Sequence, residues 1–260
     1  MNVSDMNLRV LQIMSMALSG WARQIDAADV QTLARECGVD EREAVIQLFA
    51  AQCGVEDREK IERYFRLSIE KVDADAFLRN PYLQTVRFPR KTRGRWKLDT
   101  MKYQPYELFV RDELLMMPDG REIPRLGYFD RETAYPAVLE DGREWMTVTP
   151  NEIATMEEAV RRANGHVVAM GLGLGYFAFR ASEKPEVARV TVVERDPDVI
   201  ALSRRASAAV PEWGENHRCA GRRVYVCRKA PARFRRGFCV RRSLARHGGR
   251  RGNVPAHKEV

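Results

Sequence analysis

The chain has 260 residues, of which 45% are hydrophobic, and a formal net charge of +8, so it can bury one large core or two smaller ones. It has no run of about 18 apolar residues, which argues against a membrane span. Its five cysteines form no CxxC pair, which argues against a zinc site or a disulfide framework and favours a cytoplasmic protein with reduced thiols.

We expect a helical domain over residues 1–79, because apolar residues recur there at helical spacing. The periodic stretches are Leu8–Leu18, Val30–Leu33, Ala44–Phe49 and Ile61–Ile69. Leu33-Ala34 followed by Cys37-Gly38-Val39 resembles a helix-turn-helix. The domain, however, holds ten basic against fourteen acidic residues, the wrong balance for binding phosphates. We therefore favour a helical lid or a dimerisation module, through which the chain could form a homodimer.

Residues 80–148 are predicted to form a small antiparallel β element. Six prolines interrupt any long helix, and Asp119-Gly120 and Asp141-Gly142 are turn signals suited to hairpins. The strand-like pieces are Glu107–Val110, Ile123–Phe129 and Trp145–Val148.

A basic run lies inside this segment. Residues 87–97 (RFPRKTRGRWK) place six basic and two aromatic residues in eleven positions. Such a run could grip phosphates or an acidic substrate, with Trp96 as a stacking surface. The simpler interpretation, which we favour, is a solvated basic loop.

From Thr149 the pattern becomes α/β. Thr149-Pro150-Asn151-Glu152 is a capping box with proline at the first helical position, and Gly165 is expected to end that helix. Short buried strands are expected at Val167–Met170 and Val190–Val193, each followed by a helix. An alternation of helix and strand implies that the strands are parallel.

The stretch VVAMGLGLGY (residues 167–176) places glycines at alternate positions directly after the first of these strands. A glycine-rich turn lets a ligand approach the backbone, and the helix that follows offers free amide groups. Glu194 ends the second strand nineteen residues after Gly175, where an acid can accept bonds from both hydroxyls of a ribose. The turn and the acid together indicate a ligand that contains adenosine.

A dinucleotide is the less favoured ligand of this kind. Its fingerprint requires glycine at position 176, which is Tyr176 here. We expect the bulky side chain to obstruct the approach of a pyrophosphate to the start of the helix.

The spacing Gly171-x-Gly173-x-Gly175 resembles motif I of class I S-adenosylmethionine-dependent methyltransferases. VTVVERDPDVI (residues 190–200) is similar to the second strand and the ribose-binding acid of that family, and most similar to its spermidine-synthase-like branch. The resemblance covers about residues 149–210. It implies that residues 149–211 are the N-terminal part of a Rossmann-like methyltransferase domain, with S-adenosylmethionine as cofactor and an unknown methyl acceptor.

The resemblance also implies roles for individual residues. Glu194 would hold the ribose hydroxyls and Arg195 would lie near the adenine. Most members have an acidic residue two positions before the first glycine, where this chain has Ala169, so the contact to the amino group of the cofactor has no candidate. No catalytic residue is assigned. The turn residues that would border the methionine and ribose portions are Gly171, Leu172, Gly173, Gly175 and Tyr176.

The composition changes abruptly in the last part of the chain, residues 212–260. Residues 215–260 contain twelve arginines and two lysines against two glutamates, a net +12, so the first 214 residues carry 8 − 12 = −4. One interpretation is a nucleic-acid-binding tail. The other, which we favour, is a shifted reading frame: shifting the codons by one base permits KIIVVQGDAF from Glu215 and DFAFVDLWHD from Gly237, and both strings resemble later strands of the family.

A shifted frame would leave the methyltransferase domain incomplete. We then expect the tail to be poorly ordered, the two parallel strands to have unpaired edges, and cofactor binding and methyl transfer to be impaired.

Three functions are therefore considered. Methyl transfer is favoured. The second is aminopropyl transfer from the decarboxylated cofactor, which would need acidic side chains to hold a polyamine. The third is noncatalytic binding of nucleic acid through residues 87–97 and the tail, which the sequence allows but does not favour.

Overall fold

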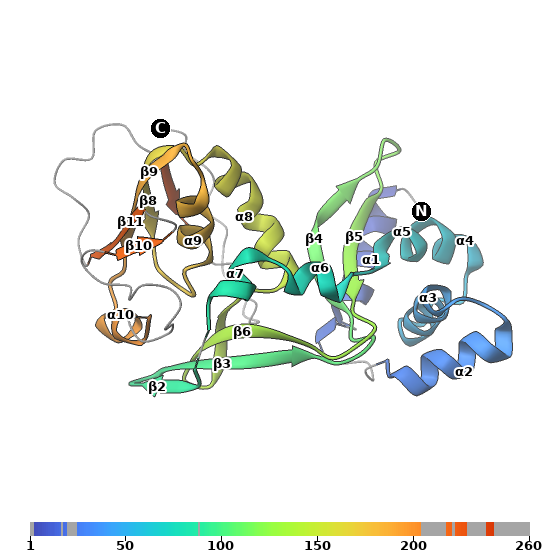
Figure 1. Ribbon diagram of the computed structural model, residues 1–260. Coiled ribbons are helices and arrows are strands. Elements are labelled where there is room, and N and C mark those ends of the chain that lie inside the picture. Colours follow the sequence, from blue (N-terminus) through green and yellow to red (C-terminus); the bar gives the residue numbers. More distant parts are fainter. Residues whose placement is uncertain are drawn as a thin grey trace.

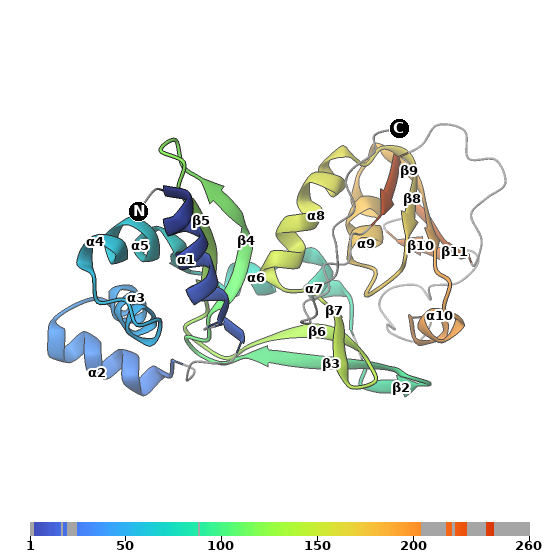
Figure 2. The ribbon, with the colours of Figure 1, turned by 180° about the vertical axis from the view of Figure 1, so that it is seen from behind.

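The computed structural model describes residues 3–16, 18–19, 25–87, 89–203, 217–219, 222–227 and 238–241, the last three segments by their backbone alone. The N-terminal helices lie at one end of the molecule and a mixed sheet lies at the other, with a long antiparallel sheet running between them (Figure 1). Helices α7 and α8 lie between the two ends (Figures 1 and 2).

The expected N-terminal helices are confirmed. Their starts follow from acidic N-caps: Asp26 and Asp40 each accept a hydrogen bond from a backbone N–H in the first turn. Gly38 ends the second helix in the left-handed conformation. These helices are α1 (Val3–Met16), α2 (Ala27–Cys37), α3 (Glu41–Gln52), α4 (Arg58–Lys60), η2 (Ile61–Phe65), α5 (Arg66–Ser68) and α6 (Ala74–Leu78). A further short helix, α7 (Pro81–Thr85), lies in the segment that was expected to be β-rich.

A three-stranded sheet packs against helices α1, α3 and α5. Its order is β1-β5-β4, where β1 (Ile69–Lys71) is parallel to β5 (Glu122–Tyr128) and β4 (Phe109–Met116) is antiparallel to it. Ile123 and Leu126 of β5 share a buried core with Val45 and Phe49 of α3. This sheet therefore combines strands from both sides of residue 79, and β1 is a strand within the segment expected to be helical.

Residues 80–148 do not form one antiparallel element as expected. The predicted strands Glu107–Val110 and Ile123–Phe129 overlap β4 and β5 of the three-stranded sheet, whereas Trp145–Val148 overlaps β7 of a four-stranded sheet of order β2-β3-β6-β7. Its strands are β2 (Lys91–Arg93), β3 (Trp96–Tyr103), β6 (Thr133–Glu140) and β7 (Arg143–Thr147). The interpretation of residues 87–97 as a loop is wrong, because Lys91–Arg93 pairs with Trp96–Leu98 in a β-hairpin. The expected exposure to solvent is confirmed for residues 90–95.

The helices and strands after Thr149 follow the predicted order. They are α8 (Pro150–Arg162), β8 (Gly165–Met170), α9 (Tyr176–Glu183), β9 (Val187–Val193) and α10 (Pro197–Ser203). The Thr149 side chain caps α8 by accepting a hydrogen bond from the Glu152 amide at 3.4 Å. Gly165 does not end α8, which stops at Arg162; with φ of 57° it opens β8 instead.

Strands β8 and β9 are parallel, as expected, but their edges are not open. The mixed sheet has the order β10-β11-β9-β8-β12. Strand β11 (Arg222–Cys227) lies parallel to β9, β12 (Phe238–Arg241) lies parallel to β8, and β10 (His217–Cys219) is antiparallel to β11. The prediction of unpaired edges is therefore wrong, because the Arg-rich segment supplies a neighbour to each strand. The rest of residues 212–260 lies outside the described part of the chain.

One core joins the antiparallel sheet to the α/β part. Trp96 and Leu98 of β3 and Met146 of β7 are buried together with residues of β8, α9 and β9. Among the described helices, none combines the length and the apolar character needed to cross a membrane.

Candidate functional site

The five residues 171–175 connect β8 to α9 and form the predicted glycine turn. Gly171, Gly173 and Gly175 have φ angles of 92°, 54° and 78°, a region that residues with a side chain rarely adopt. The turn is tied down at both ends: the Gly171 amide donates to the Val193 carbonyl at 2.7 Å, and the Gly175 amide donates to the Leu172 carbonyl at 2.8 Å. The alternate glycines are thus required by the backbone itself.

Glu194 lies against this turn. Its carboxylate is buried, with 9% of the residue exposed, and Oε2 accepts a hydrogen bond from the Leu172 amide at 2.9 Å. The other oxygen, Oε1, accepts from the Asp196 amide at 2.9 Å. A carboxylate oxygen can accept two hydrogen bonds, so each oxygen keeps capacity for one more donor.

The exposed part of the turn is at Gly171. A Cβ atom at Gly171 would have nothing within 4 Å, whereas one at Gly173 would lie 2.0 Å from the sulfur of Met146. Arg195 is exposed, and Met170 is 40% exposed. A ligand can therefore approach the backbone at Gly171, and Gly173 is required by packing inside the protein.

Tyr176 belongs to the core. It is 3% exposed, its ring packs edge-on against Tyr82 at 5.2 Å between centroids, and its hydroxyl accepts a hydrogen bond from Asn80 Nδ2 at 3.1 Å. The reason given for disfavouring a dinucleotide is thus wrong, because this side chain is turned toward α7.

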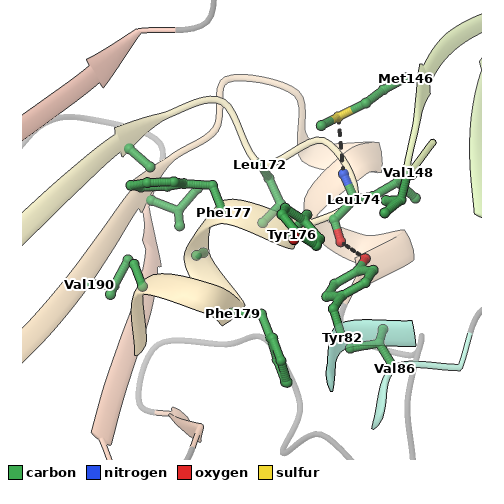
Figure 3. Packing of buried hydrophobic residues seen from close by; sticks show 14 of the residues in the cluster. Tyr82, Val86, Met146, Val148, Leu172, Leu174, Tyr176, Phe177, Phe179 and Val190 are labelled. Carbon is green, nitrogen blue, oxygen red and sulfur yellow. Dashed lines mark hydrogen bonds between the residues drawn. The ribbon is translucent and has the colours of Figure 1, made fainter. Parts of the chain in front are cut away.

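The turn is held from outside by two residues that the sequence did not single out. The Tyr82 hydroxyl donates to the Leu174 carbonyl, and the Leu174 amide donates to the Met146 sulfur at 3.4 Å (Figure 3). Burial, with Tyr176 as its neighbour, raises the pKa of Tyr82 well above its usual value, so its hydroxyl remains a donor. No local pattern could reveal these contacts, since Tyr82 and Leu174 are 92 residues apart.

The basic hairpin reaches the other side of the site. Arg93 forms an ion pair with Asp198 at 2.7 Å, and Arg95 forms one with Asp196 at 3.0 Å. The Trp96 indole N–H donates to Asp196 Oδ2 at 2.8 Å. Trp96 is only 4% exposed and does not offer the stacking surface considered from the sequence.

Asp196 remains charged in this setting. Partial burial by itself would raise the pKa of Asp196, but hydrogen bonds from Trp96 and from the backbone amides of Asp198 and Val199, together with the Arg95 charge, hold it below its usual value.

Within the described residues, no group of three or more His, Cys, Asp or Glu side chains could hold a metal ion. Comparison with known proteins finds no match: no family model, no curated protein and no solved structure is similar to this chain.

Proposed function

We propose that the glycine turn binds S-adenosylmethionine and that the chain has a Rossmann-like methyltransferase architecture that transfers a methyl group to an acceptor of unknown class. The observation that carries the proposal is the contact between Glu194 and the turn. A buried carboxylate at the end of β9 bonds to the Leu172 amide, directly beside the open backbone at Gly171.

The order of the sheet supports the same site. The parallel strands lie in the order β11-β9-β8-β12, so the chain moves outward from β8 through β9 to β11 and then returns to the other side of β8. In doubly wound sheets this order begins the 3-2-1-4 series, and ligands bind beyond the carboxyl ends of the strands where the direction reverses. Gly171 and Glu194 follow the carboxyl ends of β8 and β9.

The residues present fit this cofactor. The carboxylate of Glu194 has acceptor capacity for the two ribose hydroxyls, and the missing side chain at Gly171 leaves room for the ligand against the backbone. When bound, the cofactor supplies an electrophilic methyl group. The task of the protein is then mainly to hold that group in line with an acceptor.

The nucleic-acid alternative loses its support from the hairpin. Arg93 and Arg95 are engaged by carboxylates of α10 and its cap, and Arg90 and Lys97 both pair with Asp99, at 3.0 and 2.5 Å. Charges that are already paired offer less to a phosphate backbone. Aminopropyl transfer would use the same turn with the decarboxylated cofactor, so a choice of ligands separates it from methyl transfer.

Calorimetry on the full chain tests the proposal, with S-adenosylmethionine, its decarboxylated form and S-adenosylhomocysteine as ligands. Impaired binding was expected from an incomplete domain with open strand edges, and the edges of β8 and β9 are paired with β12 and β11. We therefore expect a dissociation constant of about 1–100 µM.

Substitution tests the role of Glu194 in this binding. Glu194→Gln should weaken binding roughly 10-fold or more, because bonds to a charged group are lost. Glu183→Gln, at the far end of α9 and paired with Arg180, is the matched control. Absence of saturable binding by all three ligands would overturn the proposal.

A further inference from the structure

Hydrogen bonds connect the basic hairpin to the glycine turn through three successive contacts. The Trp96 indole N–H donates to Asp196 Oδ2 at 2.8 Å. The Asp196 amide donates to Glu194 Oε1, and the Leu172 amide donates to Glu194 Oε2, both at 2.9 Å. Residues 96 and 172 are thus linked through the short segment 194–196.

We propose that Trp96 and Asp196 are positioning residues that fix the Glu194 carboxylate against the glycine turn. The proposal deepens the proposed function and rests on it for the identity of the ligand. One part of the proposal does not depend on the ligand: the hairpin β2–β3 fixes the position of the Glu194 carboxylate at the end of the mixed sheet. This part can be measured in the protein without any ligand.

Asp196 is suited to this role because its side chain is held at two points. Oδ1 accepts a hydrogen bond from the Asp198 amide at 2.9 Å at the start of α10. Oδ2 accepts from the Trp96 indole and from Arg95 Nη2, at 2.8 and 3.0 Å. With the side chain fixed in this way, the backbone N–H of Asp196 points at Glu194 without further freedom to reorient.

Trp96 is a rigid anchor rather than a surface side chain. It lies in β3 opposite Glu140 of β6, and its ring packs edge-on against Trp145 at 5.6 Å between centroids. The Arg95 guanidinium lies 5.1 Å from the ring centroid, close enough for a cation–π contact. The four-stranded sheet therefore fixes the position of the indole N–H.

The hairpin lies close to α10 beyond this one bond. Gly94 has φ of 55°, and a Cβ atom there would lie 2.7 Å from Asp198 Oδ2. The positive φ favours glycine at the tip of the hairpin, and any side chain there would displace the Asp198 carboxylate. The tip can thus bring Trp96 within reach of Asp196.

The consequence is preorganisation of the ribose acceptor. If the Glu194 carboxylate rotated freely, a ligand would have to order it on binding. Because both oxygens already accept hydrogen bonds from backbone amides, the free-energy cost of ordering the carboxylate on ligand binding is reduced. The antiparallel sheet then contributes to ligand affinity through the hydrogen-bonded series Trp96–Asp196–Glu194–Leu172, which we call the relay.

Asp196→Asn is the principal test. The amide oxygen of asparagine can still cap α10, but a neutral side chain cannot accept from Trp96 with the same strength while also capping. In nitrogen–proton NMR spectra we expect the Trp96 indole resonance and the Leu172 amide resonance both to move. Affinity for S-adenosylmethionine should fall about 3- to 10-fold.

Trp96→Phe is the second variant, because it removes the donor and leaves Asp196 intact. Arg93→Gln is the matched control: it breaks another contact between the hairpin and α10 but lies outside the relay. It should leave the Leu172 resonance and the ligand affinity unchanged. Near-ultraviolet circular dichroism on each variant verifies that it is folded.

The outcomes separate the two proposals. If the wild type binds no adenosine ligand but Leu172 still shifts in Asp196→Asn and Trp96→Phe and not in Arg93→Gln, the relay stands and the proposed function fails. If both relay variants keep the wild-type Leu172 resonance and the wild-type affinity, the relay is overturned. The relay is also overturned if Arg93→Gln shifts Leu172 as strongly as the two relay variants do.

Discussion

At the scale of single residues, two of the glycines of the turn, Gly171 and Gly173, have different reasons to be glycine. Gly171 has a positive φ and open space, and Gly173 has a positive φ and a buried neighbour, Met146. A sequence motif presents them as equivalent. The structure leaves open space beside the first and packs Met146 against the second.

This difference predicts unequal effects of alanine. Gly171→Ala should cost about 1–2 kcal/mol of unfolding free energy, from the left-handed backbone alone. Gly173→Ala should cost at least about 1 kcal/mol more, because the new methyl group displaces the buried Met146 side chain. Urea denaturation measures both losses. The extra loss should largely disappear in a Met146→Ala background, and equal losses in the two single variants would contradict the assignment.

Two buried tyrosines give a second prediction. The Tyr82 hydroxyl bonds to the Leu174 carbonyl, whereas the Tyr128 hydroxyl is fully buried and has no hydrogen-bond partner among the described residues. Tyr82→Phe should therefore destabilise the protein by about 1–2 kcal/mol, and Tyr128→Phe should be neutral or stabilising. Denaturant midpoints of the two variants provide the comparison. A loss at Tyr128 as large as that at Tyr82 would show that Tyr128 has a partner.

At the scale of secondary-structure elements, the hairpin β2–β3 pairs arginines of the basic run, residues 87–97, with carboxylates and so argues against a role in nucleic-acid binding. If Arg93 and Arg95 contacted phosphates, replacing both by glutamine would weaken nucleic-acid binding and reduce its salt slope by about 2. Because both are paired with carboxylates, we expect the double variant to bind RNA and DNA with the affinity and salt slope of the wild type. Gel shifts over a series of salt concentrations test this. A weaker dependence of affinity on salt concentration in the variant would show that Arg93 and Arg95 do contact nucleic acid.

Helices and strands could be predicted from the sequence where hydrophobic periodicity agrees with the signals for the start and end of an element. Between Thr149 and Ser203 all five elements were found in order, because the capping box, the buried valine runs and the glycine turn are local signals. Strands β3 and β6 were missed. Charged residues alternate with apolar ones along β3, and Pro136 interrupts the pattern of β6, so their pairing only becomes evident in the sheet.

Part of the candidate site could be predicted from the sequence, and part of it could not. Gly171 and Glu194 could be recognised because their spacing follows from one strand–turn–helix unit and the next strand. The contacts of Tyr82, Trp96 and Met146 could not be predicted, because each residue reaches the site across a long separation in sequence, 92 residues for Tyr82 and 100 for Trp96. Such contacts depend on how the sheets pack against each other, and the spacing of residues along the chain does not predict them.

At the scale of the whole molecule, the Arg-rich segment is the sharpest disagreement between sequence and structure. Composition suggested a tail without structure, yet β11 and β12 flank β9 and β8 in parallel register. The coding DNA around codons 205–220 tests the shifted-frame hypothesis: an intact frame with no family-like alternative frame would rule it out. The role of the segment in this chain can be tested on the protein itself.

Deleting residues 212–260 would remove β10, β11 and β12 and leave β8 and β9 each with one open edge. Exposed parallel edges next to a truncated core are unstable and prone to pair with other chains. We expect a loss of about 3 kcal/mol or more, which corresponds to a fall in Tm of about 10 °C, together with increased aggregation. Thermal unfolding and light scattering measure the two effects.

A shorter deletion, residues 242–260, is the control for this experiment, because it shortens the chain but keeps all three strands. If the longer deletion melts like the full chain, β11 and β12 contribute nothing to stability, and the segment behaves as the tail that its composition suggested. If only the longer deletion is destabilised, the sheet that carries the glycine turn extends into the Arg-rich segment. The geometry of Gly171 and Glu194 then depends on strands that follow them in the chain as well as on the hairpin that precedes them.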